Sequence, residues 1–360
     1  MTMTKVRLLV IEDSTTVRKR LCEVLASDPG IEVIGEAADG KRAIELCCAL
    51  RPDAVTMDMM LPVMSGLAAT EYIMAHCPTP ILIVSASTNR GELFRTYEAL
   101  AAGALDVLDK PLGDERDEDW ERRLVSVVKL ISRIRVITHP RARLGAYGRP
   151  QAAPVPPARL STAADSRYRA VAIGTSTGGP AAIVQVLGAL PREFTLPVLL
   201  VLHIGEPFGT AFADWLDGQI GRPAAYARDG ESVMSAAGCV VMAPPDRHLV
   251  VHEGRLRLTR DPERHSCRPS VDVLFESMAG EFGPGAAACL LTGMGRDGAA
   301  GLLQIRQAGG FTIAQDEATS VVYGMPREAA LLGAAERVLP LGEIGSMLAS
   351  LAPARVEEKL

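Results

Sequence analysis

Hydrophobic and polar positions alternate between two kinds of segment along the first third of the chain. Short apolar runs rich in β-branched residues predict strands, and longer segments with apolar positions three or four apart predict helices. The predicted strands are residues 6–13, 31–37, 53–58, 80–86 and 104–110. Helix-length segments such as 15–27 and 40–51 separate them. This alternation predicts a doubly wound sheet of five parallel strands, with ligands at the carboxyl ends of the strands.

A second α/β pattern begins near residue 168 and differs from the first by one hairpin. Its predicted strands are residues 169–176, 196–203, 238–244, 248–254, 255–259, 286–293 and 309–316. The turn Glu253-Gly254 joins two of them, which predicts antiparallel strands beside a mostly parallel sheet. Residues 135–167 are rich in Pro, Ala and Arg and lack apolar periodicity, which is typical of a flexible linker. We therefore expect three parts, at residues 4–134, 135–167 and 168–356.

Composition narrows the class of protein. A chain of 360 residues is long enough for two domains, and its net charge of −5 disfavours nucleic acid as a main partner. No apolar run reaches the length of a membrane span, and the first residues resemble no signal peptide, so a cytoplasmic protein without membrane insertion is expected. Seven cysteines without a C-x-x-C pair predict reduced thiols. Each is more often a buried apolar side chain than a catalytic one.

Polar side chains stand at the carboxyl ends of the first domain's predicted strands. Glu12 and Asp13 end the first strand and Asp58 the third, and crowded carboxylates of this kind favour Mg²⁺. An aspartate beside Mg²⁺ can accept a phosphoryl group. Ser85 and Lys110 end the fourth and fifth strands and can contact a phosphate oxygen. Any one of these residues alone could be a solvated strand end, but five in this order indicate a site.

The motifs VIEDS, VTMDMMLPVMSG, VSAS and LDKP in residues 4–134 resemble the response-regulator receiver domain of two-component signalling. The resemblance implies a flavodoxin-like fold in which Asp58 is phosphorylated. It further implies that Mg²⁺ binds to Glu12, Asp13, Asp58 and the carbonyl oxygen of Met60. A histidine kinase would be the phosphate donor.

Residues 172–183, AIGTSTGGPAAI, join a strand pattern to a helix pattern through a glycine-rich turn. A dinucleotide-binding loop requires G-x-G-x-x-G, and Ser176 stands where its second glycine belongs. A Walker loop requires a lysine after its last glycine, where Pro180 stands. G-x-S-x-G does match, and its small residues permit a sharp turn that exposes the serine hydroxyl. Ser176 is therefore a candidate nucleophile, although the motif also occurs by chance.

A serine nucleophile needs a base and a group that orients the base. His203 ends a predicted strand and is the best-placed base, whereas His248 and His252 flank the hairpin and are expected at the surface. Asp297, in the glycine-rich loop of CLLTGMGRDGAAG, can orient the histidine or can merely cap the following helix. The chain order Ser, His, Asp differs from that of α/β-hydrolases and disfavours that fold.

The motifs GTSTGGP, TGMGRDGA, RPSVDVLFES and VVYGMPREAA resemble the catalytic domain of the chemotaxis protein-glutamate methylesterase and glutamine deamidase, the CheB family. By this resemblance Ser176 is the nucleophile, His203 the base and Asp297 its orienting group. The backbone N–H of Met294 would help to stabilise the oxyanion, and Thr177 would line the same cleft. The family commonly has Gln-His-Met-Pro where this chain has residues 202–205, LHIG, which bears on substrate preference.

The expected function is that of a phosphorylation-activated serine hydrolase, a monomer that demethylates glutamate methyl esters and deamidates glutamines on methyl-accepting chemoreceptors. The receiver domain would require Mg²⁺, and the hydrolase chemistry would require no cofactor. Recruitment to membrane-bound receptor arrays is expected. Three alternatives stay open at this point: a transcriptional regulator, a non-catalytic scaffold, and a hydrolase of the same kind in another sensory pathway.

Overall fold

The computed structural model describes residues 5–86, 89–110, 117–134, 136 and 167–352. The chain divides into two compact units, Met1–Arg149 and Pro150–Leu360, which are described separately. The linker expected at residues 135–167 lies outside the described residues except for Val136 and Arg167. The domain boundaries proposed from the sequence therefore stay a prediction.

The first unit is a five-stranded sheet in the order β2-β1-β3-β4-β5, in which all pairs are parallel. Its strands are β1 (Val6–Ile11), β2 (Ile31–Ala37), β3 (Ala54–Met57), β4 (Ile81–Ser85) and β5 (Asp106–Asp109). Its helices are α1 (Thr15–Ala26), α2 (Gly40–Leu50), α3 (Gly66–His76), α4 (Arg90–Ala101) and α5 (Glu118–Ile131). The strand order reverses between β1 and β3, which creates a crevice at their carboxyl ends.

Helices cover both faces of this sheet, as its strands require. Strands β1, β3 and β4 are almost completely buried, because α1 and α5 pack together on one face and α2, α3 and α4 on the other. Cys48 in α2 and Cys77 at the end of α3 form a disulfide with a Cα–Cα distance of 5.8 Å. The expectation that all cysteines are reduced is wrong for this pair, since the packing of α2 against α3 brings two distant thiols together.

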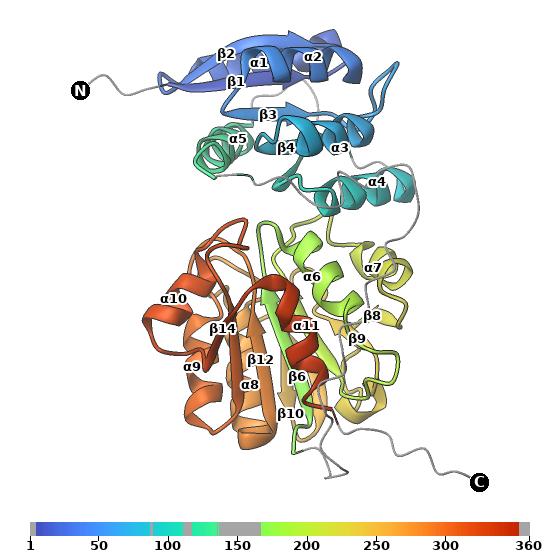
Figure 1. Cartoon of the computed structure of the whole chain (residues 1–360), viewed down its shortest axis with the longest axis vertical. Helices are drawn as coiled ribbons and strands as arrows, with labels where there is room; N and C mark the ends of the chain where they lie inside the picture. The colour runs from blue at the N-terminus through green and yellow to red at the C-terminus, as the bar shows by residue number, and fades with distance from the viewer. Residues whose placement is uncertain (1–4, 87–88, 111–116, 135, 137–166, 353–360) are drawn as a thin grey trace. The chain divides into compact units, whose positions relative to one another are not determined.

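The second unit is built on a seven-stranded parallel sheet in the order β14-β13-β12-β6-β7-β9-β8 (Figure 1). Its strands are β6 (Ala170–Thr175), β7 (Val198–Leu202), β8 (Ala224–Tyr226), β9 (Val240–Met242), β12 (Ala286–Leu290), β13 (Phe311–Gln315) and β14 (Arg337–Leu339). Strands β10 (His248–His252) and β11 (Arg255–Thr259) form a separate antiparallel hairpin.

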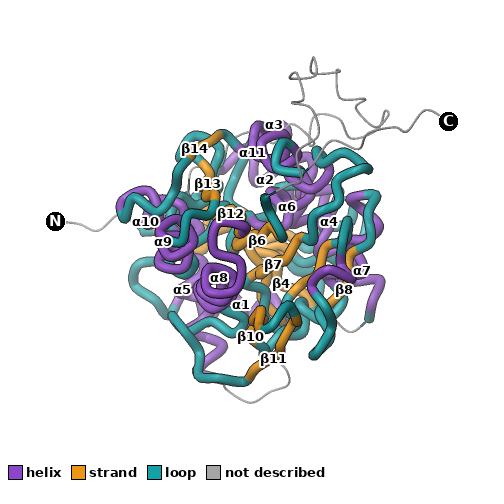
Figure 2. The backbone as a smooth tube through the Cα atoms, turned by 90° about the horizontal axis from the view of Figure 1, so that it is seen from below, coloured by secondary structure: helices purple, strands orange, loops and turns teal. Residues whose placement is uncertain are grey.

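Two groups of helices sandwich this sheet. Helices α6 (Gly179–Gly188), α7 (Phe212–Ile220) and α11 (Leu341–Ala349) pack together on one face. Helices α8 (Val271–Phe282), α9 (Ala299–Gln307) and α10 (Met325–Leu331) form the other layer. The hairpin β10–β11 packs against α8, as Figure 2 shows. No helix in the described part of the chain combines the length and the apolar character needed to cross a membrane.

The predicted architecture is confirmed in both units, including the antiparallel hairpin. The sequence patterns missed β8 and β14, which have three residues each. Both are edge strands with exposed positions, so they lack the continuous apolar run that marks the buried strands.

Candidate active site

Three loops of the second unit meet where the strand order of its sheet reverses. Ser176 and His203 directly follow the neighbouring strands β6 and β7, and the backbone N–H of His203 donates to the carbonyl of Thr175 at 3.0 Å. Asp297 lies in the loop after β12, which pairs with the opposite side of β6. The chain runs outward from β6 through β7 and later returns on the other side as β12. A crevice at such a position is where doubly wound folds bind ligands.

Glycines make the turn around Ser176 possible. Gly178 has a φ of +77°, in the left-handed region, and a Cβ added there would lie 2.6 Å from Val321 Cβ. At Gly174 an added Cβ would lie 2.1 Å from Val271 Cγ1. Side chains larger than hydrogen at these positions would collide with packed neighbours. The G-x-S-x-G spacing is therefore explained by the sharp entry into α6, with Ser176 left partly exposed.

The loop after β12 fixes the backbone of Ser176. The backbone N–H of Ser176 donates to the carbonyl of Thr292 at 3.1 Å. The hydroxyl of Thr292 donates to the carbonyl of Thr177 at 3.0 Å. Gly293 lies so close that an added Cβ would come within 2.9 Å of Ser176 Cβ. The serine is thus held by backbone contacts to a segment more than a hundred residues away in sequence.

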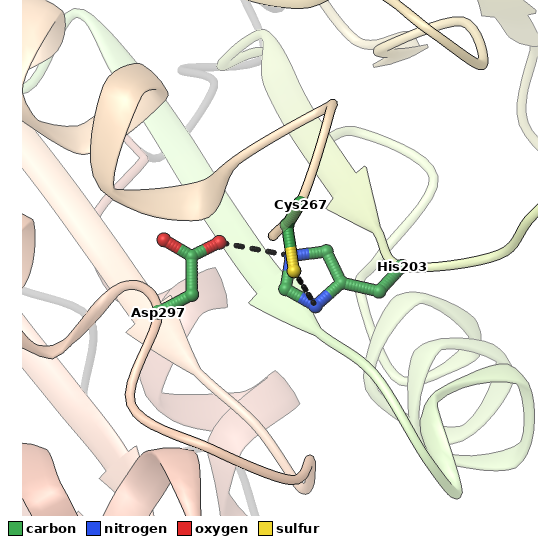
Figure 3. Close-up of side chains that lie close together, drawn as sticks. All are labelled: His203, Cys267 and Asp297. Carbon is green, nitrogen blue, oxygen red and sulfur yellow. Dashed lines mark hydrogen bonds and ion pairs between the residues drawn. The ribbon is translucent and has the colours of Figure 1, made fainter. Parts of the chain in front are cut away.

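His203 and Asp297 form a hydrogen-bonded pair. His203 Nε2 lies 2.9 Å from Asp297 Oδ2, and both side chains are largely buried, with 13% and 3% exposure (Figure 3). The second ring nitrogen, Nδ1, lies 3.7 Å from the sulfur of Cys267. Since Asp297 occupies Nε2, the nitrogen left to accept a proton from a nucleophile is Nδ1.

Asp297 is fixed by the beginning of α8 rather than by its own helix. Its Oδ1 accepts hydrogen bonds from the hydroxyl of Ser270 at 2.7 Å and the backbone N–H of Asp272 at 3.1 Å. Its Oδ2 accepts one from the backbone N–H of Val271 at 2.7 Å. Burial works to raise the pKa of Asp297, but hydrogen bonds from His203, Ser270 and Val271 outweigh it and lower the pKa. Helix α9 begins at Gly298 without a side-chain cap, so the alternative that Asp297 caps α9 is wrong.

The environment of His203 favours its protonated form. Burial alone would lower the pKa of this imidazole, but its hydrogen bonds with Asp297 and Cys267 raise the pKa to about 9. A carboxylate beside one nitrogen and a thiol beside the other both stabilise the imidazolium. The group is therefore suited to holding a proton taken from a nucleophile.

Ser176 Oγ forms no hydrogen bond within the described residues, so the structure joins the predicted base and acid but leaves the serine hydroxyl free. The backbone N–H groups of Thr177 and Met294 likewise donate to no acceptor in the part of the chain that is described. These two N–H groups, on the loops after β6 and β12, are therefore available as hydrogen-bond donors. The side chain of Met294 itself is 49% exposed.

A cleft of about 490 Å³ opens beside Asp297. His265, Cys267, Met294 and Arg296 are among its lining residues. The loop that precedes α8 therefore forms one wall of this cleft.

In the first unit, the three predicted acids come together at the crevice between β1 and β3. Carboxylate oxygens of Glu12, Asp13 and Asp58 all lie within 4.8 Å of one another. Lys110 Nζ lies 2.8 Å from Glu12 Oε2 and 2.9 Å from Asp58 Oδ2. Burial raises the pKa of Glu12 and the charge of Asp58 adds to this, while Lys110 opposes both. Ser85 Oγ is buried without a hydrogen-bond partner among the described residues.

This pocket fits a hard cation and a phosphoryl group. Lys110 contacts the carboxylates of Glu12 and Asp58 but not that of Asp13, so a divalent cation would relieve the repulsion among the three acids. The carbonyl oxygen of Met60 accepts no hydrogen bond from any described residue and stays available as a ligand. The unpaired hydroxyl of Ser85 can donate to a phosphate oxygen.

Comparison with known proteins gives two family matches. The CheB methylesterase model matches residues 171–348, and the response regulator receiver domain model matches residues 8–117. A relative from Nitrosospira multiformis, named protein-glutamate methylesterase/protein-glutamine glutaminase, is 42% identical over 99% of both chains. The chain belongs to the CheB methylesterase family. A second relative with this name, from Anaeromyxobacter dehalogenans, is 43% identical over 96% of this chain and 97% of its own.

The chain is also similar to solved structures. The crystal structure of the Thermotoga maritima CheB methylesterase catalytic domain is 34% identical, covers 51% of this chain and 99% of its own, and has a TM-score of 0.49.

The sequence interpretation of this CheB-family chain missed two neighbours of the site and misplaced one residue. Ser270 contacts Asp297 and Cys267 contacts His203, but the sequence pattern assigned neither residue a role in the site. His248 was expected at the surface, as was His252. His252 is exposed, but His248 is fully buried and accepts a hydrogen bond from the N–H of Ser270 at 3.1 Å. The hairpin packs against α8, which covers this end of β10.

Proposed function

We propose that this chain is a serine hydrolase that removes methyl groups from glutamate methyl esters of chemoreceptors and deamidates their glutamines. The observation that carries the proposal is the buried His203–Asp297 pair, placed one strand from the partly exposed Ser176 at the reversal point of the sheet. Membership of the CheB family supplies the substrate class, because relatives that match almost end to end are named for these two reactions.

In the proposed reaction, Ser176 Oγ attacks the ester carbonyl carbon while its proton moves to Nδ1 of His203. A modest turn of the serine and imidazole side chains must bring these atoms together, since no hydrogen bond joins them beforehand. Asp297 stabilises the imidazolium through Nε2. The N–H groups of Thr177 and Met294 donate to the oxyanion. The tetrahedral intermediate collapses as His203 returns the proton to the departing methoxide, and methanol leaves.

The acyl-enzyme is then hydrolysed by the same groups in reverse. His203 takes a proton from water as the water oxygen attacks the acyl carbon, and the proton passes to Ser176 Oγ as the bond to serine breaks. A glutamine side chain follows the same course and releases ammonia. No cofactor takes part in this chemistry, and His203, Ser176 and the N–H donors suffice.

The first unit is proposed to regulate the second. The structure's acidic pocket fits Mg²⁺ held by Glu12, Asp13, Asp58 and the Met60 carbonyl, and such an ion would offset the charge of an incoming phosphoryl group. Asp58 Oδ would attack the phosphorus of a phosphohistidine on a sensor kinase, while Ser85 and Lys110 hold the phosphate oxygens. The unphosphorylated receiver is expected to restrain the esterase, and phosphorylation to release it.

The proposed partners follow from this chemistry. They are methyl-accepting chemoreceptors as substrates and a chemotaxis histidine kinase as phosphate donor, in the cytoplasm at receptor arrays. No nucleic-acid partner and no membrane insertion are proposed, and the chain is proposed to act as a monomer.

Methanol release from a methylated receptor tests the esterase proposal. We expect Ser176→Ala to lower the rate at least about 10³-fold, because such sites keep only the stabilisation from binding and the oxyanion donors. Ser235→Ala, at an exposed serine of the same unit, is the matched control and should keep the wild-type rate. Full release by Ser176→Ala, or no release by the wild-type chain, would overturn the proposal.

A further inference from the structure

Cys267 is placed unlike the other free cysteines of the described chain. Its sulfur lies 3.7 Å from Nδ1 of His203, the ring nitrogen that Asp297 does not contact (Figure 3). The preceding residues His265 and Ser266 both have positive φ angles, +53° and +59°, an unusual backbone for non-glycine residues. This loop conformation directs the thiol at the base instead of into the core.

A thiol in contact with an imidazole nitrogen can transfer its proton to it. The product is a thiolate beside an imidazolium, and the thiolate is the form of cysteine that reacts with electrophiles and oxidants. Asp297 stabilises the same imidazolium from the other nitrogen, so the two contacts act in the same direction. Cys267 competes with Ser176 for the same acceptor atom.

Cys267 is also accessible. It is half-buried and lines the cleft of about 490 Å³, together with the charged or titratable side chains of His265, Arg296, Asp297 and Glu328. Arg296 Nε donates to His265 Nδ1 at 3.3 Å on this rim. The cleft therefore gives a small molecule an open path to the thiol.

We propose that Cys267 is a reactive thiol whose covalent modification by peroxides and other small thiol-reactive electrophiles blocks the base of the esterase. With hydrogen peroxide, the sulfur attacks one oxygen, the S–O bond forms and the O–O bond breaks. The departing hydroxide takes the proton of the His203 imidazolium and leaves as water. Sulfur is oxidised by two electrons to the sulfenic acid, and the peroxide is reduced.

Two other free cysteines serve as internal controls in the same protein. Cys22 is half-buried beside Glu36, and burial together with that carboxylate raises the pKa of its thiol to about 11. Cys239 is also half-buried, and its sulfur contacts the carbonyl of Ala237 at 3.7 Å, as that of Cys267 contacts the carbonyl of His265 at 3.4 Å. No imidazole of the described chain contacts the sulfur of Cys239. Exposure of the three thiols is thus comparable, and the imidazole partner distinguishes Cys267.

The test is the rate of labelling of the intact chain by methyl methanethiosulfonate, followed peptide by peptide with mass spectrometry. At about pH 7 we expect Cys267 to react at least about 10-fold faster than Cys239, and Cys22 to be slowest. His203→Gln should slow labelling of Cys267 at least about 10-fold without changing that of Cys239. The comparison of Cys267 with Cys239 uses the wild-type chain alone, so it does not depend on the folding of a variant.

Equal labelling rates for Cys267 and Cys239, or no effect of a folded His203→Gln variant, would overturn the proposal. The consequence for activity rests on the proposed esterase function. Methylthiolation or peroxide treatment should abolish methanol release by the wild-type chain, and dithiothreitol should restore it. After the same treatment, the Cys267→Ser variant should release methanol at the rate that this variant shows without treatment. If Cys267 is labelled fast but the wild-type chain releases no methanol, the proposed esterase function is refuted and the proposal of a reactive thiol stands.

Discussion

The two ring nitrogens of His203 have different partners, and this division sets what the residue can do. Asp297 holds Nε2 and fixes the plane of the imidazole, while Cys267 occupies the approach to Nδ1. In the proposed mechanism, Ser176 Oγ would have to approach the same ring nitrogen that Cys267 contacts.

The pKa of His203 predicts how activity depends on pH. A general base must be neutral to accept a proton, so kcat/KM for methyl ester hydrolysis should rise with pH up to about 9. Cys267→Ser removes one group that raises this pKa, so its rise should begin at lower pH. Initial rates of methanol release from about pH 6 to about pH 10 measure both profiles, with Cys239→Ser as the control. Superimposable profiles for Cys267→Ser and wild type would count against the contact seen here.

The same pKa predicts a stability change. A histidine whose pKa rises on folding stabilises the folded chain fully below its unfolded pKa of about 6.5, and this stabilisation is lost as pH rises through about 9. His203→Gln should therefore lower the free energy of unfolding more at about pH 6 than at about pH 10. One pKa unit corresponds to about 1.4 kcal/mol, so the difference should reach about 3 kcal/mol. Urea unfolding of the wild type and of His203→Gln at the two pH values measures this difference. An equal loss of unfolding free energy at both pH values would contradict the prediction.

At the scale of elements, α8 is as much a part of the site as the catalytic loops. Its first N–H groups and its cap residue Ser270 hold both oxygens of Asp297. The positive end of a helix favours a carboxylate in this position. The hydrogen bonds at the beginning of α8 therefore also orient Asp297, and Asp297 in turn orients His203.

Because the loops after β6 and β12 lie close together, adding one methyl group at Gly293 should disturb the position of Ser176. In Gly293→Ala the new Cβ would lie 2.3 Å from Met325 Sδ and 2.9 Å from Ser176 Cβ, so the serine must shift. We expect methanol release to fall at least about 10-fold, because small displacements of reacting groups are costly. Gly188→Ala, whose added Cβ meets no atom within 4 Å at the end of α6, should keep activity. Wild-type rates in Gly293→Ala would show that the contact does not position Ser176.

At the scale of the whole molecule, the chain combines two doubly wound units whose sites both lie at reversal points of strand order. In the first unit a lysine neutralises two buried carboxylates, and in the second a carboxylate stabilises an imidazolium. Under the proposed function, the first site accepts a phosphoryl group and the second transfers an acyl group. The proposed regulation then requires that phosphorylation of Asp58 change the activity at Ser176.

Acetyl phosphate tests that connection. With Mg²⁺ present, it should raise the rate of methanol release by the wild-type chain several-fold and leave Asp58→Asn unchanged. Asp39→Asn is the matched control, because asparagine caps a helix as well as the aspartate that caps α2. Its response should equal that of the wild type. Stimulation of Asp58→Asn, or equal wild-type rates with and without the phosphate donor, would refute regulation through Asp58.

The sequence was sufficient for the architecture and for the residues that stand at strand ends. Buried parallel strands give continuous apolar runs, so β1, β6 and β7 could be read from the pattern, and Ser176 and His203 follow such strands directly. The position of Cys267 could not be read, because it depends on a loop with an irregular backbone. The burial of His248 depends on packing between the hairpin and α8, which no local pattern encodes.

Ser176, His203 and Asp297 all follow the carboxyl ends of strands in the parallel sheet of the second unit, whereas the turn before β14 lies at the opposite rim. Gly333, in the exposed turn that leads into β14, has a φ of +65°, and an added Cβ there meets no atom within 4 Å. Lengthening a surface turn adds little entropic cost. A fluorescent reporter or an affinity tag inserted at this turn would therefore leave the active-site loops unchanged, so the turn is a suitable position for labelling the protein.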